Sequence, residues 1–199
     1  MTRLLFATNN QHKIEEIRAA IGNLVEVVGL KEAGIDIDVR EPHNTLKANA
    51  SEKSSAIFAL TGTSCFSEDS GLEVQALNEE PGVRSARYAG EGRSQEDNID
   101  KLLDHLKGKA DRSARFRTVI SLIWAGQEYF FEGICEGMIS GERKGASGFG
   151  YDAVFIPSGS VRSFGEMSIK EKNTFSHRKK AADKLVLFLQ QQRQITAHD

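Results

Sequence analysis

Strand-like and helix-like segments alternate along the first half of the chain, and this alternation restricts the fold more than any other feature. Residues 3–8 form a short apolar run, and residues 12–24 then carry apolar side chains at helical spacing. Residues 25–30 read as a second strand, and a helix with Thr45 as its N-cap follows. Segments in this order predict an α/β fold, in which helices cover a sheet.

The second half departs from this alternation. Ser94 is a suitable N-cap for a helix, and residues 116–124 then alternate between apolar and polar positions. A turn at Gly126 leads back into a further strand, and because such a hairpin joins antiparallel strands, we predict a mixed sheet. After the last helix, the polar residues 190–199 are predicted to form a frayed tail.

Length and composition limit the class of protein. The 199 residues are 39% hydrophobic and 27% charged, which predicts one globular domain spanning residues 1–199. No apolar run approaches the ~18 residues of a membrane span, and the N-terminus lacks a signal-peptide pattern, so we expect no membrane partner. Cys65 and Cys135 lack metal-ligand spacing and are predicted to be reduced and buried, as is typical of a cytoplasmic protein. The net charge of −2 gives no electrostatic basis for binding a nucleic-acid polymer.

Two adjacent carboxylates follow an apolar segment. Glu68 and Asp69 come directly before Ser70 and Gly71, and a glycine at this place suits a sharp turn. We therefore predict a strand that ends in a turn and presents both carboxylates at the sheet edge. Like charges repel, but a divalent cation with hard oxygen ligands, such as Mg²⁺, would stabilise the pair. A solvated acidic turn is the alternative.

Cationic residues occupy the first turn of two predicted helices, where acidic residues are usually preferred. His12 and Lys13 follow the first predicted strand, and His177 and Arg178 follow Ser176, a suitable N-cap. A bound anion would explain cations in these positions, and phosphate is the natural candidate. The alternatives are a solvent-exposed Lys13 and a carboxylate partner for Arg178. On the anion interpretation, Arg178→Glu is not expected to lower the stability of the empty protein.

Two further segments carry side chains suited to a nucleotide. Asn49 and Lys53 lie four residues apart on the buried face of the helix that Thr45 caps, and a buried lysine needs a partner or a cleft. Residues 145–152 form a glycine-rich loop with two aromatic residues, whose rings offer a stacking face for a flat heterocycle. Each signal alone is weak, because lysines often extend to solvent from a buried position and turns often contain aromatic residues.

Together, these segments resemble the inosine triphosphate pyrophosphatase family. The matching motifs stand in the family's order between residues 3 and about 189. They are ATNNQHK at 7–13, EDSGL at 68–72, PGVRSARYAG at 81–90, GFGYD at 148–152 and SHR at 176–178.

The resemblance implies an α/β fold with a long mixed central sheet flanked by helices, and two lobes with the substrate cleft between them. It also implies a homodimer. The implied reaction is the Mg²⁺-dependent hydrolysis of the non-canonical purine nucleotides ITP, XTP and dITP to the monophosphate and pyrophosphate, which cleanses the nucleotide pool.

The resemblance further assigns roles to single residues. The catalytic residue would be Asp69, which orients or deprotonates the attacking water and binds Mg²⁺ together with Glu41 and Glu68. The phosphates would be held by Thr8, Asn9, Asn10, Gln11, His12 and Lys13. Other substrate-binding residues would be Asn49, Lys53 and, beside Asp69, Ser70. Residues around the base would be Phe149, Gly150, Tyr151 and Asp152, with Lys172, His177 and Arg178 reading its oxygen.

Two departures from the family pattern leave the metal ligands open. Glu68 stands where many members have Asp, and residues 42–44 lack the commoner glycine. Three other functions also stay open at this stage. They are a pyrophosphatase for other modified nucleotides such as pyrimidines, a nucleotide-binding module without hydrolysis, and a nucleic-acid-binding protein, which the charge balance disfavours.

Overall fold

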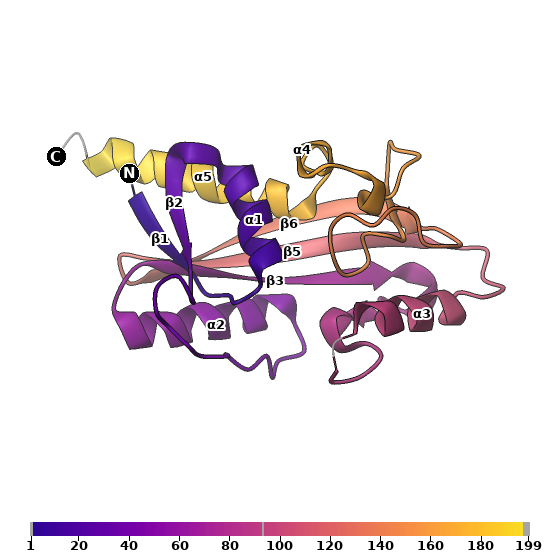
Figure 1. The fold of residues 1–199 in the computed structure, drawn as a ribbon. Coiled ribbons are helices and arrows are strands. Elements are labelled where there is room, and N and C mark those ends of the chain that lie inside the picture. The colour runs from indigo at the N-terminus through magenta and orange to yellow at the C-terminus, as the bar shows by residue number, and fades with distance from the viewer. Residues whose placement is uncertain (1, 93, 197–199) are drawn as a thin grey trace. The chain divides into compact units, whose positions relative to one another are not determined.

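The computed structural model describes residues 2–92 and 94–196 and has an α/β fold (Figure 1). Its strands are β1 (Thr2–Phe6), β2 (Val25–Gly29), β3 (Cys65–Val74), β4 (Pro81–Gly82), β5 (Ser113–Trp124), β6 (Gln127–Ile139) and β7 (Phe155–Pro157). Its α-helices are α1 (Gln11–Ile21), α2 (Leu46–Thr61), α3 (Gln95–His105), α4 (Ile169–Lys172) and α5 (His177–Thr196). Short 3₁₀ helices are η1 (Gly22–Leu24), η2 (Gln75–Leu77), η3 (Ser85–Arg87) and η4 (Phe164–Glu166).

The strands form one sheet in the order β2-β1-β3-β5-β6-β7, and β4 pairs with β3. β1 runs parallel to β2, with Leu4 opposite Val27, and parallel to β3. β4 runs antiparallel to β3, and β7 runs antiparallel to β6. The sheet is therefore mixed, as predicted.

Two of the predicted helix starts are confirmed at their caps. The Thr45 hydroxyl accepts from the amide of Ala48, and the Ser94 hydroxyl accepts from the amide of Asp97, both at 3.2 Å. In the first helix, the cap is Asn10, whose side chain accepts from the third amide of α1. Side-chain oxygens at these places satisfy amides that have no partner inside the helix, which fixes where each helix begins.

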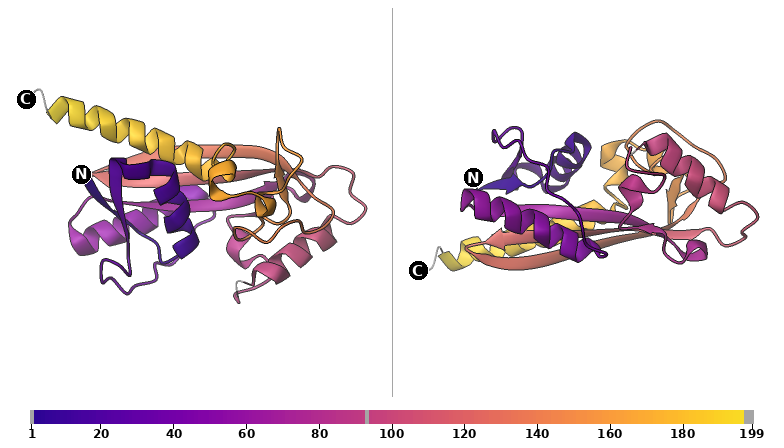
Figure 2. Two further views of the ribbon diagram at one scale, coloured as in Figure 1. Left: turned by 45° about the horizontal axis from the view of Figure 1, so that its top comes forward. Right: turned by 90° about the horizontal axis from the view of Figure 1, so that it is seen from below.

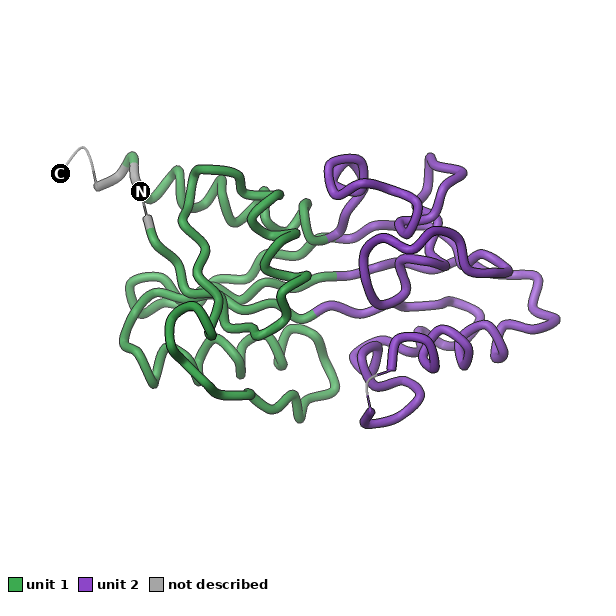
Figure 3. Tube along the Cα trace, viewed as in Figure 1, with its two compact units in different colours: residues 1–69, 118–133, 178–199 green, residues 70–117, 134–177 purple. Residues whose placement is uncertain are grey.

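The chain divides into two compact units (Figure 3). The first unit contains residues 1–69, 118–133 and 178–199, and the second contains residues 70–117 and 134–177. β3, β5 and β6 each contribute residues to both units.

In the first unit, helices cover both faces of the strands (Figures 1 and 2). α1 and α5 pack on one face, in a core that includes Phe66 of β3. α2 packs on the other face, in a core that includes Cys65. Because successive side chains of a strand point to opposite faces, these two neighbours enter different cores.

In the second unit, α3 and several aromatic rings form one core. Leu102 of α3 and Leu106, the residue that follows the helix, are fully buried in it. The ring of Phe116 on β5 lies 4.6 Å from that of Phe155 on β7, in an edge-to-face arrangement. Aromatic pairs of this kind add to the stability that burial alone provides.

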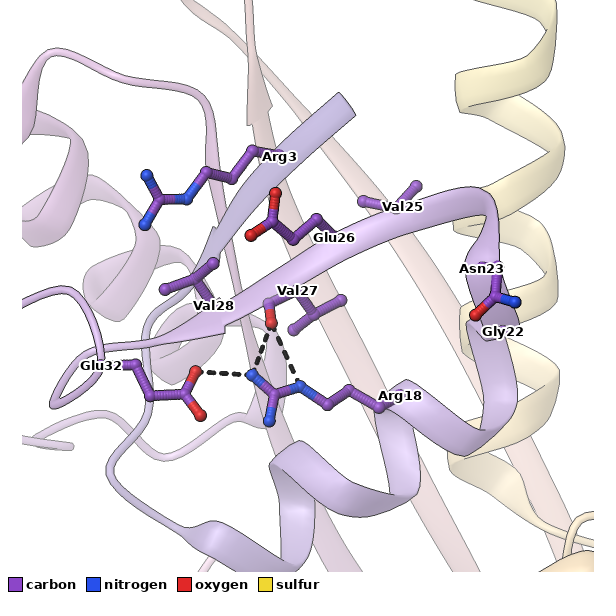
Figure 4. Close-up of a pocket in the computed structure, with 9 residues that line it drawn as sticks. All are labelled: Arg3, Arg18, Gly22, Asn23, Val25, Glu26, Val27, Val28 and Glu32. Carbon is purple, nitrogen blue, oxygen red and sulfur yellow. Dashed lines mark hydrogen bonds and ion pairs between the residues drawn. The ribbon is translucent and has the colours of Figure 1, made fainter. Parts of the chain in front are cut away.

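An ion pair closes the outer edge of β2 (Figure 4). Arg18 donates to the carbonyl of Val27 from Nε at 3.1 Å and from Nη2 at 2.7 Å, and its partner Glu32 accepts from the amide of Gly29 at 3.0 Å. An additional parallel strand would bond to β2 through the same carbonyl of Val27 and the same amide of Gly29. Because Arg18 and Glu32 occupy these two groups, they block the pairing of another strand at this place. The side chains of Arg18 and Glu32 help to line a pocket of about 500 Å³, and none of the predicted site residues lines this pocket.

The predicted turn at Gly71 is wrong. β3 continues from Cys65 to Val74, and Glu68 and Asp69 lie inside this strand. Gly71 serves a close approach instead, because a Cβ atom there would lie 2.5 Å from the carbonyl oxygen of Gly82 on β4. The glycine that was taken to indicate a turn is therefore required by the close packing of β3 against β4.

The last helix is longer than the sequence indicated. α5 continues to Thr196, so residues 190–196 are helical, whereas they were predicted to be a frayed tail; residues 197–199 lie outside the described part of the chain. Cys65 and Cys135 are buried, as predicted. Within residues 2–92 and 94–196, no helix combines the length and the apolar character needed to cross a membrane.

Candidate functional site

Glu68 and Asp69 are neighbours in β3 and point to opposite faces of the sheet, because strand side chains alternate. Glu68 meets residues of α1 and α5, on the same face as Phe66. Asp69 meets residues of α2, on the same face as Cys65. Each carboxylate therefore has its own cationic partners, and the repulsion expected between adjacent acids is reduced.

α2 holds Asp69 at both carboxylate oxygens. Asn49 donates to Oδ2 and Lys53 donates to Oδ1, each at 3.3 Å. The Lys53 ammonium also donates to Oε1 of Glu41 at 2.7 Å. The prediction that Asn49 and Lys53 share the buried helix face is confirmed, since their exposed fractions are 0% and 7%. Two carboxylates and one ammonium leave one net negative charge at this place.

Asn49 also holds the loop that carries Glu41. Its Oδ1 accepts from the amide of His43 at 2.9 Å, and its Nδ2 donates to the carbonyl of the same residue at 3.2 Å. One buried amide thus joins the Glu41 loop to Asp69. The sequence assigned Asn49 to substrate binding, and the structure shows it bonding to the protein's own loop and carboxylate.

Burial raises the pKa of Asp69, and the nearby Lys53 ammonium opposes this only in part. Burial lowers the pKa of Lys53, but Asp69 and Glu41 outweigh it, so that the net shift is upward. Lys53 therefore stays protonated beside a carboxylate of raised pKa. Such a carboxylate is better suited than a solvent-exposed one to accept a proton from water.

On the opposite face, two cations bind Glu68. Arg178 donates from Nε and Nη2 to the two carboxylate oxygens at 2.8 Å each, and Nζ of Lys13 lies 3.2 Å from Oε1. Burial alone would raise the pKa of Glu68, but Arg178 and Lys13 outweigh it and lower the pKa to about 2. Glu68 is therefore ionised at neutral pH with both oxygens engaged.

Arg178 binds carboxylates on two elements. Besides Glu68 on β3, its Nη1 donates to Glu16 on α1, and the guanidinium side chain is only 3% exposed. The residue pattern favoured phosphate as the partner of Arg178, the family resemblance favoured a base oxygen, and a carboxylate was the alternative. In the structure, the partners of Arg178 are the carboxylates of Glu68 and Glu16.

The start of α1 presents polar groups and no acid. Thr8 Oγ1 accepts from the amide of Asn10 at 3.1 Å, and Asn9 Nδ2 donates to the carbonyl of Ile37 at 2.9 Å. Gln11 and His12 are exposed, and no acidic residue lies in the first turn. A helix N-terminus of this composition suits an anion.

In the second unit, a buried ion pair anchors the glycine-rich loop. Nζ of Lys172 donates to Oδ2 of Asp152 at 2.6 Å, and each side chain is 4% exposed. The same oxygen accepts from the amide of Phe149 at 2.9 Å. Gly148 has φ of 78°, and a Cβ atom there would lie 2.0 Å from Asp152 Oδ2, so the loop requires glycine at this position.

Two aromatic rings lie beside the ammonium group of this ion pair. The Lys172 ammonium lies 5.4 Å from the ring centroid of Phe149 and 5.1 Å from that of Phe164. Phe149 is half-buried, so part of its ring stays accessible as a stacking face.

Three other predicted site residues belong to the second unit. Tyr151 is 3% exposed and its hydroxyl donates to the carbonyl of Ser85 at 2.8 Å. The ring of His177 stacks on Phe116, with centroids 4.7 Å apart and planes at 11°. Ser70 is half-buried and follows Asp69 in β3. The contacts of Tyr151 and His177 place both side chains in the core.

Most of the predicted site residues thus belong to one of two clusters, one in each unit, which the structure extends with Glu16, Gly148 and Phe164. The charged cluster of the first unit comprises Lys13, Glu16, Glu41, Asn49, Lys53, Glu68, Asp69 and Arg178. The loop cluster of the second unit comprises Gly148, Phe149, Gly150, Asp152, Phe164 and Lys172.

Sequence reasoning missed Glu16 and His43. Glu16 is 5% exposed, but it follows another glutamate and lies outside the apolar repeat of its helix, so it looked solvated. His43 contributes backbone groups, which carry no residue-specific signal. No pattern in the sequence could have identified either contact.

Asp69 and Glu41 are the residues best suited to hold a divalent cation. Mg²⁺ is usually bound by one or two carboxylates and completes its coordination with waters and substrate phosphates, so two carboxylates suffice. Their surplus negative charge beside Lys53 also favours a cation. In residues 2–92 and 94–196, no group of three or more Cys, His, Asp or Glu residues is arranged to hold a metal ion by itself.

Comparison with known proteins gives consistent matches over nearly the whole chain. The model of the Ham1 family matches residues 4–188. A dITP/XTP pyrophosphatase of Porphyromonas gingivalis is 48% identical over 190 residues, covering 95% of this chain and 98% of the relative. A dITP/XTP pyrophosphatase of Christiangramia forsetii is 43% identical over 187 residues, covering 94% and 98%.

Solved structures agree with these sequence matches. The Ham1 protein of Staphylococcus aureus is 38% identical, with a TM-score of 0.86, covering 96% of this chain and 100% of the other. A HAM1 protein of Coxiella burnetii is 33% identical, with a TM-score of 0.87 and the same coverage. The α/β fold predicted from the sequence is therefore confirmed.

Proposed function

This chain belongs to the Ham1 family, and we propose that it hydrolyses the non-canonical purine nucleotides ITP, XTP and dITP to the monophosphate and pyrophosphate. Its relatives in Porphyromonas gingivalis and Christiangramia forsetii, both named dITP/XTP pyrophosphatases, support this substrate class. Such an activity removes deaminated purines from the nucleotide pool before they are used.

The observation that carries the proposal is the setting of Asp69. This buried carboxylate is held at one oxygen by Asn49 and at the other by Lys53, so its direction is set before substrate binds. In the proposed reaction, Asp69 orients a water molecule and accepts its proton while the water oxygen attacks the α-phosphorus. The bond from that phosphorus to the oxygen that bridges the α- and β-phosphates breaks, and pyrophosphate leaves with this oxygen.

The remaining charges of the cluster suit a triphosphate. Phosphoryl transfer needs positioning and charge neutralisation more than a covalent nucleophile. Lys13 and Lys53 supply positive charge, and residues 8–12 supply polar groups at the N-terminus of α1. Glu68 contacts Lys13, and Arg178 holds Glu68 in place while it also pairs with Glu16. These bonds stabilise the position of Lys13.

We assign Mg²⁺ to Asp69 and Glu41. When bound, the ion would neutralise charge on the phosphate oxygens. We exclude Glu68 from the metal ligands, because it points to the opposite face of β3 from Asp69 and is already bound by two cations, Arg178 and Lys13.

The loop cluster suits a purine with a 6-keto group. The half-buried ring of Phe149 offers a stacking face, and the Lys172 ammonium beside it can only donate hydrogen bonds. A 6-keto oxygen accepts such a bond, whereas the 6-amino group of adenine is itself a donor. GTP shares the keto group, so its rejection depends on the 2-amino group.

The family resemblance extends the proposal to a homodimer in the cytoplasm. The buried thiols agree with a reducing compartment, and burial raises the pKa of Cys65 to about 12, so that this thiol stays protonated and unreactive. Light scattering on the protein as it elutes from a size-exclusion column measures its molar mass, and hence the number of subunits.

Product analysis tests the proposed reaction. With Mg²⁺, we expect ITP to yield IMP and pyrophosphate in equal amounts, and we expect a metal chelator to stop the reaction. Chromatographic separation of IMP, IDP and the two phosphate products decides this. Release of IDP and inorganic phosphate would reject the pyrophosphatase assignment, and preferential hydrolysis of modified pyrimidine triphosphates would move the protein to another substrate class.

A further inference from the structure

Residues 81–90, the motif PGVRSARYAG, have no role in the proposed site. We propose that this segment is a platform that positions the glycine-rich loop at residues 148–152, and that Tyr151 is the positioning residue that joins the two. The inference rests on the proposed function and adds residues outside the site to base recognition. Every contact that supports it lies within the second unit.

Tyr151 makes the direct link. It belongs to the loop, yet its side chain is 3% exposed and its hydroxyl donates to the backbone carbonyl of Ser85 at 2.8 Å. A hydroxyl buried to this extent is costly without an acceptor, so the bond favours one position of the loop over others.

The carbonyl that receives this bond is itself held in place. The Ser85 hydroxyl accepts from the amide of Leu72 on β3 at 2.9 Å and donates to the carbonyl of Gly82 at 2.6 Å. β3 and β4 pair directly at this point, with Leu72 opposite Gly82. Ser85 is therefore tied to a sheet strand and not to a mobile loop.

α3 secures the other end of the platform. The side chain of Asn98 accepts from the amide of Ala89 at 2.6 Å and donates to the carbonyl of Ala86 at 3.1 Å. Lys101 donates to the carbonyl of Tyr88 at 2.8 Å. Three backbone groups between residues 86 and 89 are thus bonded to one helix.

The same helix reaches the glycine-rich loop independently. Gln95, the first residue of α3, accepts from the amide of Gly150 at 2.7 Å. The preceding loop amide, that of Phe149, donates to Asp152, which binds Lys172. Loop residues that surround the proposed base site are therefore held by α3 and by the platform.

This arrangement predicts that recognition of the base can be weakened without changing the bond-breaking step. The carboxylate and the lysines assigned to phosphate chemistry belong to the first unit, whereas Tyr151 and its partners belong to the second. Loosening the loop is therefore expected to weaken recognition of the base and to leave the bond-breaking step unchanged. In kinetic terms, KM should rise while kcat stays constant.

Tyr151→Phe tests the link, because it removes the hydroxyl and keeps the ring. We expect KM for ITP to rise about fivefold to tenfold, kcat to stay within about twofold, and the preference for ITP over ATP to fall by a similar factor. The matched control is Tyr129→Phe, which removes an exposed hydroxyl bonded to Gln127 at 2.7 Å and should change none of these values. Unchanged KM and selectivity in Tyr151→Phe, or a fall in kcat common to all substrates, would overturn the proposal.

A second pair of variants tests the link from α3. Gln95→Leu loses the acceptor for the Gly150 amide and should raise KM, whereas Gln95→Glu keeps an acceptor and should retain the wild-type KM. Hydrogen exchange of residues 148–152 gives a readout that does not depend on turnover. We expect faster exchange in Tyr151→Phe and Gln95→Leu than in the wild type and both controls. If the wild type hydrolyses no triphosphate, this exchange still decides the platform role, and equal exchange in all variants would refute it.

Discussion

Asp69→Asn is expected to fold and to lose turnover. The amide keeps the size of the side chain but removes the charge that orients water and holds the metal. It also places an amide group against Asn49 or Lys53, both of which donate to Asp69 in the wild type. Loss of a general base lowers rates by ~10²–10⁴-fold, so we expect kcat for ITP to fall by about that factor. Pyrophosphate release at saturating ITP and Mg²⁺ measures the loss.

The control for this variant is Asp183→Asn on α5. It makes the same change of carboxylate to amide in the same unit, at a side chain that is 55% exposed. Its kcat should match the wild type. Circular dichroism on both variants checks that they are folded. If folded Asp69→Asn kept near-normal kcat, the role of base would pass to Glu41.

Arg178→Glu is expected to destabilise the protein strongly. The change leaves Glu16 and Glu68 buried without their shared cation and adds a third carboxylate between them. Breaking a buried ion pair by removing one partner costs ~3–5 kcal/mol. A favourable acid at a helix N-terminus contributes only ~0.3–1 kcal/mol. The ion-pair loss therefore outweighs the dipole gain, which reverses the effect on stability expected from the sequence.

Lys180→Glu separates these two effects. Lys180 lies in the first turns of α5 like Arg178, but its side chain is exposed. Exposed charges contribute at most about 1 kcal/mol, so we expect Lys180→Glu to change the free energy of unfolding, measured by urea titration, far less than Arg178→Glu does. Equal stability of the two variants would mean that the bonds of Arg178 to Glu16 and Glu68 contribute little.

Much of the fold could be predicted because it depends on local signals. Apolar periodicity located the strands and helices, and Thr45 and Ser94 cap helices as predicted. Gly71 misled the prediction because a glycine can serve a turn or a close approach, and only the position of β4 distinguishes the two. The end of α5 was missed because polar residues continue an exposed helix as readily as they form a tail.

The site could be predicted as a set of residues but not as a set of contacts. Asn49 and Lys53 were correctly placed on one buried face, since helical spacing alone determines that. The partners of Arg178 lie 110 and 162 residues away along the chain, and no local pattern reports contacts across such separations. The opposite directions of Glu68 and Asp69 follow from strand alternation, once the predicted turn is replaced by a continuous strand.

The most direct test of the proposed function is the ratio of kcat/KM for ITP to that for ATP, measured by pyrophosphate release under one set of conditions with Mg²⁺. The two substrates share the triphosphate and the ribose, so the ratio reports the base alone. A site built to donate a hydrogen bond to a keto oxygen rejects an amino group at that position by up to ~10⁴-fold. We predict a ratio of at least ~10², with Asp152 and Lys172 fixing the loop that reads the base. Comparable values of kcat/KM for ITP and ATP would contradict the assignment of this protein to non-canonical purine nucleotides.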